Sequence, residues 1–285
     1  MLISGLSAIA ARYDALLCDV WGVLHNGREA YPGVADALGR FRAGGGRVLL
    51  LSNAPRPSTT LPEMFERMGI PHDVYDGILT SGDATRTYLG SRTLGDACYY
   101  IGPDRDLALF DGTGVERVDE AQAAFILVTG PFNDEIEGPE DYRRQFENLV
   151  ARRLPLVCAN PDIIVERGSK HIYCAGALAA LYEELGGEVV YFGKPHRPIY
   201  EVARRRLADI AGGPVADARI LAVGDGPLTD MLGAGDAGID ALFVTGGIAA
   251  ADCGPAPESP DEARVEAVLA RAGVRAVAAM PRLVW

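Results

Sequence analysis

Short apolar runs alternate with amphipathic stretches along the chain, and this alternation predicts repeated strand–helix units. Such units build a largely parallel sheet with helices on its faces. The pattern therefore predicts an α/β fold with a doubly wound parallel core. The expected strands are Ala15–Cys18, Arg47–Leu51, Ile78–Thr80, Cys98–Ile101, Ala124–Thr129, Leu156–Ala159, Glu188–Phe192, Arg219–Val223 and Asp240–Val244.

Helix boundaries are marked by proline at the start and glycine or proline after the end. One helix is expected at Pro62–Met68, because Pro62 suits a first helical turn and Gly69 suits the stop. The same signals predict three further helices, at Glu140–Arg153, Ala177–Leu185 and Asp261–Ala272.

Composition narrows the classes of protein that this chain can represent. The 285 residues suffice for about two domains, and the net charge of −12 disfavours a nucleic-acid partner. Five scattered cysteines without a CxxC pair indicate a reducing compartment, with neither a disulfide framework nor a zinc site. No apolar run reaches the roughly 18 residues of a membrane span. We therefore expect a cytoplasmic protein that binds no membrane.

Polar residues stand where several of the apolar runs end. Asp19 closes the first run, Ser52 follows the second, and Asp225 follows Arg219–Val223. Ligands of parallel sheets bind at the carboxyl edge of the strands, so one cleft can gather these side chains. Magnesium prefers oxygen ligands, and one or two carboxylates suffice to hold it. With Asp230 nearby, the spacing predicts a magnesium-dependent phosphoryl-transfer site.

Each of these residues also has a simpler interpretation. Asp19 taken alone could be a helix cap or a surface acid. Asp230 either braces the loop or holds a metal-bound water, or it is an ordinary acid at the start of a helix. Lys194 either balances the charge of Asp19 and a phosphoryl group or is an exposed lysine. Ser52 and Asn53 either donate to a phosphate or only begin a turn.

Two further predictions concern the middle of the chain. The long interval between Ser52 and Lys194 carries its own strands, so we expect an inserted domain at residues 78–186 and a core made of residues 1–77 and 187–285. Within the insertion, Asn160 and Asp162 are candidate substrate contacts, although a polar loop explains them equally well.

Five short motifs follow one another along the chain: Asp19-Val20-Trp21-Gly22-Val23, Leu51-Ser52-Asn53, Asn160-Pro161-Asp162, Gly193-Lys194-Pro195 and Gly224-Asp225 to Thr229-Asp230. In this order they resemble the haloacid dehalogenase superfamily, and within it subclass IIA, the NagD-like and nitrophenylphosphatase-like proteins. The resemblance implies a Rossmann-like core with an α/β cap of the C2 type. It also implies Asp19 as the nucleophile that forms an aspartyl-phosphate, with Ser52 and Lys194 positioning the phosphoryl group.

Magnesium is the cofactor that the resemblance implies. Its ligands would be Asp19, the carbonyl of Trp21 and Asp225, with Asp230 in support. Dehalogenases of the superfamily lack a magnesium site, so the presence of Asp225 and Asp230 favours phosphoryl chemistry over dehalogenation.

Trp21 departs from the family pattern. The family's phosphatases carry an aspartate there, which protonates the leaving group and activates water, whereas an indole N–H only donates a hydrogen bond. Loss of such acid–base help typically costs about 10²–10⁴ in rate. His25 is either a replacement acid and base or an exposed turn histidine.

The sequence thus predicts a magnesium-dependent hydrolase, a phosphatase acting on a small phosphorylated metabolite. Two alternatives stay open: an impaired phosphometabolite-binding or regulatory protein, and a phosphotransferase whose aspartyl-phosphate persists. Sugar phosphates, nucleotides and pyridoxal phosphate are all possible substrates, because no motif reports the choice. The resemblance allows a homodimer.

Overall fold

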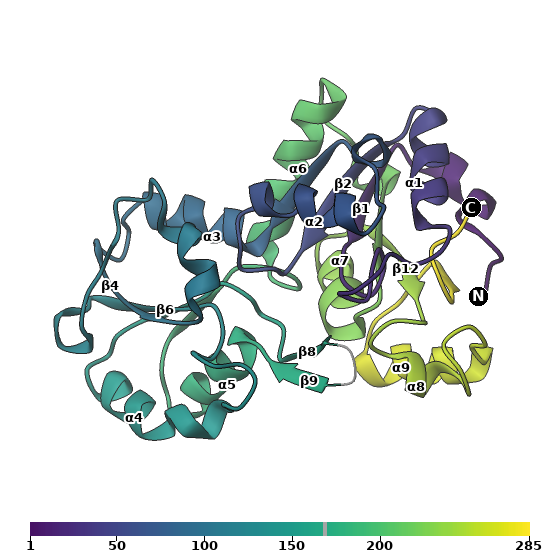
Figure 1. Ribbon diagram of the computed structural model, residues 1–285. Coiled ribbons are helices and arrows are strands. Elements are labelled where there is room, and N and C mark those ends of the chain that lie inside the picture. Colours follow the sequence, from purple (N-terminus) through teal and green to yellow (C-terminus); the bar gives the residue numbers. More distant parts are fainter. Residues whose placement is uncertain (168–169) are drawn as a thin grey trace. The chain divides into compact units, whose positions relative to one another are not determined.

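The computed structural model describes residues 1–167 and 170–285, and it divides into two compact units (Figure 1). The first unit consists of Met1–Ser52, Thr60–Leu79 and Tyr200–Trp285, and the second of Asn53–Thr59 and Thr80–Ile199. Each unit is built on its own sheet, which confirms the α/β class with parallel strands and flanking helices.

The sheet of the first unit has six strands with β1 near its centre. Strand β1 pairs in parallel with β11 on one side and with β2 on the other. All five residues of β1 are buried, as expected for a strand covered on both faces. In spatial order the strands are β13 (Ala278–Met280), β12 (Asp240–Val244), β11 (Ile220–Gly224), β1 (Ala15–Asp19), β2 (Arg47–Ser52) and β3 (Gly77–Thr80).

Helices cover this sheet through apolar stripes. In α1, the buried residues Val34, Ala37, Leu38 and Phe41 follow the spacing of one helix face and join the core formed by the strands. Helix α9 begins at the cap Asp261, which accepts a hydrogen bond from the Arg264 N–H, and it ends at Gly273. The helices are α1 (Val34–Ala43), α2 (Pro62–Arg67), α6 (Arg197–Ala211), α7 (Leu232–Asp236), α8 (Ala250–Cys253) and α9 (Glu262–Ala272).

The sheet of the second unit has five parallel strands. Successive residues of β6 alternate between its two faces: Phe125 and Leu127 join one apolar cluster, Ile126 and Val128 the other. Helix α3 (Ser81–Gly90) packs into the first cluster, α4 (Arg143–Ala151) and α5 (Ala175–Glu184) into the second. The strands in order are β10 (Val189–Tyr191), β7 (Leu156–Cys158), β6 (Phe125–Val128), β4 (Ala97–Ile101) and β5 (Glu116–Arg117), beside an antiparallel pair, β8 (Ile164–Arg167) and β9 (Lys170–Tyr173).

All nine expected strands are present, and every strand end lies within one residue of the expected one. The helix expected at Glu140–Arg153 is shorter, because residues 139–142 form a separate 3₁₀ turn before α4. The strand expected at Glu188–Phe192 is present as β10 and pairs with β7. In the described part of the chain, no helix is both long and apolar enough to cross a membrane.

Candidate active site

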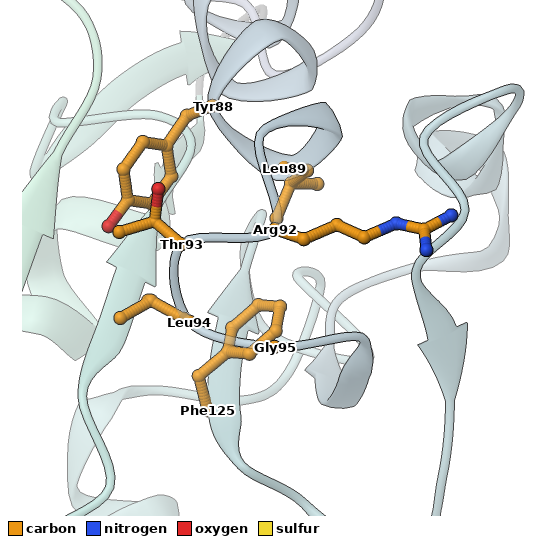
Figure 2. Close-up of a pocket in the computed structure, with 7 residues that line it drawn as sticks. All are labelled: Tyr88, Leu89, Arg92, Thr93, Leu94, Gly95 and Phe125. Atoms are coloured by element: carbon orange, nitrogen blue, oxygen red, sulfur yellow. The ribbon is translucent and has the colours of Figure 1, made fainter.

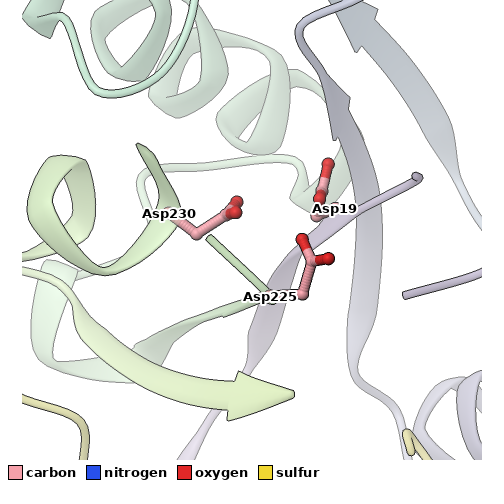
Figure 3. Close-up of side chains that lie close together, drawn as sticks. All are labelled: Asp19, Asp225 and Asp230. Carbon is pink, nitrogen blue, oxygen red and sulfur yellow. The ribbon is translucent and has the colours of Figure 1, made fainter. Parts of the chain in front are cut away.

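Three buried carboxylates meet at the carboxyl edge of the six-stranded sheet (Figure 3). Asp19 is the last residue of β1, and Asp225 follows the last residue of the neighbouring strand β11. Asp230 lies in the helical turn Pro227–Met231 that follows β11. Each of the three offers an oxygen within 4.8 Å of the others, and their side chains are only 7, 6 and 4% exposed. Parallel pairing of β1 with β11 thus brings together residues that are far apart in the sequence.

Asp225 is enclosed by backbone on two sides. The Ile248 N–H donates a hydrogen bond of 2.7 Å to its Oδ2. A Cβ atom on Gly22 would lie 1.9 Å from that oxygen, and one on Gly247 would lie 2.0 Å from it. Both positions therefore require glycine, because any side chain there would displace the carboxylate.

Asp230 braces the turn that carries it. Its Oδ2 accepts hydrogen bonds from the Gly226 N–H at 3.1 Å and from the Thr229 hydroxyl at 3.3 Å. The brace and the cluster are compatible, because the same carboxylate offers an oxygen to the group formed with Asp19 and Asp225.

Ser52 reaches the same edge of this sheet from the other side. It is the last residue of β2, and β2 pairs in parallel with β1 so that Leu51 faces Asp19. The side chain is buried. The structure therefore places Ser52, Asp19 and Asp225 at the ends of three adjacent strands, as the sequence predicts.

In the second unit, the Asn53 side chain holds the backbone of Lys194. Its Oδ1 accepts a 2.7 Å hydrogen bond from the Lys194 N–H, and its Nδ2 donates to the Lys194 carbonyl at 2.9 Å and to Asp162 Oδ1 at 2.8 Å. Both amide hydrogens of Asn53 are thus used within the protein. The sequence suggests that the Asn53 side chain donates a hydrogen bond to a phosphate. In this structure it clamps the Lys194 backbone instead.

Lys194 and Asn160 are buried beside this clamp. Lys194 is 3% exposed, and Asn160 Oδ1 accepts a hydrogen bond from the Asp162 N–H at 3.0 Å. A buried ammonium group is stable only with acceptors or anionic groups around it, so an ordinary exposed lysine is the wrong description of Lys194.

Trp21 packs inside the loop that follows β1. Its ring meets the His25 ring edge to face, with 5.3 Å between centroids and 71° between planes. On another side, its Cη2 would lie 2.5 Å from a Cβ atom on Gly27. The indole is therefore part of the packing of residues 20–30.

His25 is fully buried, so the expectation of an exposed turn histidine is wrong. Its Nδ1 accepts a hydrogen bond from the Gly27 N–H at 2.9 Å, which leaves the ring hydrogen on Nε2. Among the described residues, Nε2 has no hydrogen-bond partner. Burial lowers the pKa of His25 to about 4, so the ring is neutral at pH 7 and is no acid of near-neutral pKa.

The second unit has a small hollow of its own (Figure 2). It is lined by the end of α3, the loop before β4 and the first residue of β6, which lie at the amino edge of that sheet. Asn160 and Lys194 follow β7 and β10 at the carboxyl edge. The hollow therefore does not belong to the candidate site. Its lining residues are Tyr88, Leu89, Arg92, Thr93, Leu94, Gly95 and Phe125.

Comparison with known proteins agrees with this arrangement. The family model for haloacid dehalogenase-like hydrolases matches residues 16–116, and a second, HAD-hydrolase-like model matches residues 191–270. A crystal structure of a haloacid dehalogenase-like hydrolase from Brucella suis 1330 is 44% identical, covers 99% of this chain and 100% of its own, and has a TM-score of 0.88. The chain belongs to the haloacid dehalogenase-like hydrolase family. The predicted family and the predicted class of enzyme, a hydrolase, are thereby confirmed.

More distant relatives match most of this hydrolase's chain. The Escherichia coli K12 protein named ribonucleotide monophosphatase NagD is 27% identical over 242 residues, which are 83% of this chain and 89% of that protein. The structure of p-nitrophenyl phosphatase from Archaeoglobus fulgidus, at 20% identity and a TM-score of 0.72, covers 95% of this chain and 96% of its own and shows the same fold.

Sequence reasoning missed Gly247, although a signal was present. Gly246 and Gly247 follow strand β12, which neighbours β11 in the sheet. A pair of glycines at the end of an apolar strand indicates close backbone approach at the edge where ligands bind. The clamp formed by Asn53 left no such signal, because its partners are distant in the sequence.

Proposed function

We propose that this hydrolase is a magnesium-dependent phosphatase, which hydrolyses a small phosphate ester through an aspartyl-phosphate on Asp19. The cluster of Asp19, Asp225 and Asp230 is the observation that carries the proposal. At 4.8 Å and an effective dielectric constant of about 20, two carboxylates repel each other by roughly 3 kcal/mol. A bound divalent cation would remove this repulsion.

The donor set fits magnesium. All three side chains offer hard oxygen atoms, and Mg²⁺ is usually held by one or two carboxylates together with water and substrate oxygens. Asp19, Asp225 and the carbonyl of Trp21 would hold the ion, with Asp230 in support. When bound, the ion supplies positive charge that reduces the repulsion between the Asp19 carboxylate and the phosphoryl oxygens.

The chain's own residues then perform two displacements at phosphorus. An Asp19 carboxylate oxygen bonds to phosphorus, and the leaving oxygen departs with the electron pair of the broken bond. Ser52 and Lys194 orient the phosphoryl group and balance its charge, while Asn53 keeps the Lys194 backbone in place. A water oxygen then bonds to phosphorus, the bond to Asp19 breaks, and inorganic phosphate leaves with the protons of that water.

The relatives support a phosphate ester as substrate. Besides the ribonucleotide monophosphatase of E. coli, a chicken protein named glycerol-3-phosphate phosphatase is 25% identical over 265 residues, which are 85% of this chain and 82% of that protein. In this proposal residues 78–186 act as a cap on a catalytic core, Asn160 and Asp162 contact the substrate, and the protein works in the cytoplasm.

Phosphate release from a panel of phosphometabolites and an aryl phosphate, with and without magnesium, tests the proposal. We expect release that requires magnesium and falls at least about 10³-fold in Asp19→Asn, since the nucleophile is lost. Asp36→Asn, an exposed acid on α1, is the matched control and should keep wild-type release.

A different result selects one of the alternatives. Stoichiometric phosphorylation of Asp19 without turnover, seen after acid quench, would indicate a phosphotransferase. Tight binding of a phosphometabolite with neither release nor labelling would indicate a binding or regulatory protein.

A further inference from the structure

The fate of the leaving oxygen limits which phosphate compounds this site can cleave. When the phosphorus–oxygen bond breaks, an alkyl leaving group departs as a strongly basic alkoxide unless a proton reaches it. A positioned proton donor typically contributes about 10²–10⁴ in rate to such a step. A phenolate, enolate or carboxylate is a weak base and departs as a stable anion, so it gains little from a donor.

The residue two positions after the nucleophile offers no such donor. Trp21 follows Asp19 by two residues, and its indole N–H donates hydrogen bonds but is not acidic. The ring lies against His25 and Gly27. The indole is therefore part of the packed loop that follows the nucleophile.

The neighbouring imidazole is not available either. His25 is 0% exposed, so none of its atoms can touch a bound ester in this arrangement. Backbone hydrogen bonds hold the loop: Gly22 N–H to the His25 carbonyl at 2.9 Å, and Leu24 N–H to the Val20 carbonyl at 2.8 Å. These bonds hold the loop in the conformation that buries His25.

We infer that the substrates are activated phosphates, in which the oxygen bound to phosphorus belongs to a weakly basic leaving group: an aryl, enol or acyl phosphate. Alkyl esters such as sugar phosphates and nucleoside monophosphates are poor substrates. This inference rests on the proposed function, and it sets the chain apart from relatives named for nucleotide or glycerol phosphates.

In the first step the leaving group takes the electron pair and departs without a proton, while Asp19 becomes a mixed carboxylic–phosphoric anhydride. The second step is the same for every substrate, because only this anhydride remains. Its leaving group is the Asp19 carboxylate, which is itself weakly basic and needs no proton, while the protons of the attacking water leave with the inorganic phosphate.

A series of aryl phosphates with increasingly basic phenols, together with acetyl phosphate and glycerol phosphate, tests the inference on the full-length protein. We expect kcat/KM to fall steeply as the phenol becomes more basic, and glycerol phosphate to be at least about 10²-fold poorer than the best aryl phosphate. For the most activated substrates kcat should level off at one shared value. Intact-mass measurement after acid quench should then show phosphorylated Asp19.

Two variants test the assignment to Trp21. Trp21→Asp places a carboxyl group at this position and should raise kcat/KM for glycerol phosphate by about 10²-fold, with a shallower dependence on the leaving group. Trp21→Phe keeps an aromatic ring without the N–H and should retain the steep dependence.

Different results would contradict the inference and the proposed function. Comparable kcat/KM for glycerol phosphate and aryl phosphates, within about tenfold in the wild type, would overturn the inference and leave a phosphatase. If acetyl phosphate and the most activated aryl phosphate are neither cleaved nor able to label Asp19, the proposed function itself is wrong. The wild-type series decides the matter even if Trp21→Asp does not fold.

Discussion

At the scale of single residues, the burial of His25 disfavours the protonated form of its ring, and no neighbouring group in the part of the chain that the structure describes compensates for this. The ring is fully buried, and Nε2 has no hydrogen-bond partner among the described residues. Burial favours the neutral ring and lowers the pKa of His25 to about 4, against an ordinary value of 6.5. Protonation is therefore much easier in the unfolded chain than in the folded protein.

This pKa difference predicts a pH-dependent stability. Above pH 6.5 the His25 ring is neutral in both the folded and the unfolded protein, so it does not reduce the free energy of unfolding. As the pH falls towards about 4, only the unfolded protein gains a proton on this ring, and the folded protein loses stability. The loss amounts to about 3 kcal/mol in the free energy of unfolding. Urea unfolding followed by tryptophan fluorescence, repeated between these pH values, measures it.

His25→Asn should remove this pH dependence, because the asparagine oxygen can still accept the Gly27 N–H bond but does not titrate. The half-exposed His72 provides the control, and His72→Asn should leave the dependence unchanged. An unchanged dependence in His25→Asn would assign the effect to other groups.

Single residues also show how far the sequence predicts the site. Asp19, Ser52 and Asp225 could be grouped in advance, because each follows an apolar run and parallel strands end at one edge. The burial of His25 could not, since Leu24-His25-Asn26-Gly27 has the polar composition of a surface turn. The fit between its ring, Trp21 and Phe65 exists only in the folded loop.

At the scale of elements, the loops after β1 and β12 enclose the Asp225 carboxylate. Gly22 comes from the first loop and Gly247 from the second, and Ile248 adds the hydrogen bond to Oδ2. Strands β1 and β12 flank β11, so the acid of the middle strand is fixed by the loops of its two neighbours.

Gly247→Ala should disturb this enclosure. The new methyl group would lie 2.0 Å from Asp225 Oδ2 and would push the carboxylate out of place. Supporting groups around metal ligands are typically worth about 10–100-fold in metal affinity, and we expect a loss of this size for magnesium. Calorimetric titration with magnesium measures it.

Gly235→Ala is the matched control, because a Cβ atom there meets nothing within 4 Å. It lies in α7, where alanine is the better helix former, so magnesium affinity should be unchanged and stability slightly raised. Equal affinities in the two variants would show that Asp225 adapts to the extra methyl group.

Elements differ in how clearly the sequence marks them. The nine expected strands are apolar runs between breakers, and all are present. Strand β13 was not expected, because Ala278–Met280 is short and rich in alanine, and it exists by pairing with β12. Helix α1 is not among the expected helices, although the spacing of Val34, Ala37, Leu38 and Phe41 indicates it.

At the scale of the whole molecule, the two units have separate apolar cores. One core gathers residues from the six-stranded sheet, α1 and α2, and the second unit holds two clusters on the faces of its own sheet. Units with their own cores need not unfold in one cooperative transition.

We therefore expect urea unfolding to give different curves with different probes. Both tryptophans, Trp21 and Trp285, lie in the first unit, so fluorescence reports that unit, whereas far-ultraviolet circular dichroism reports both. The two midpoints should differ. Coincident curves would show that the two units unfold together.

The position of β1 in the first sheet has a consequence for the chain while it is being synthesised. Strand β1 forms a ladder with β11, whose residues leave the ribosome about 200 positions later, or roughly ten to forty seconds at common translation rates. Throughout that time one apolar edge of β1 lacks its final neighbour, and an unpaired strand edge invites association with other chains. Most of the second unit, by contrast, is one continuous stretch, Thr80–Ile199, and can fold before β11 emerges. The second unit can thus fold first, and the nucleophile is set in a finished sheet only after β11, β12 and β13 have emerged.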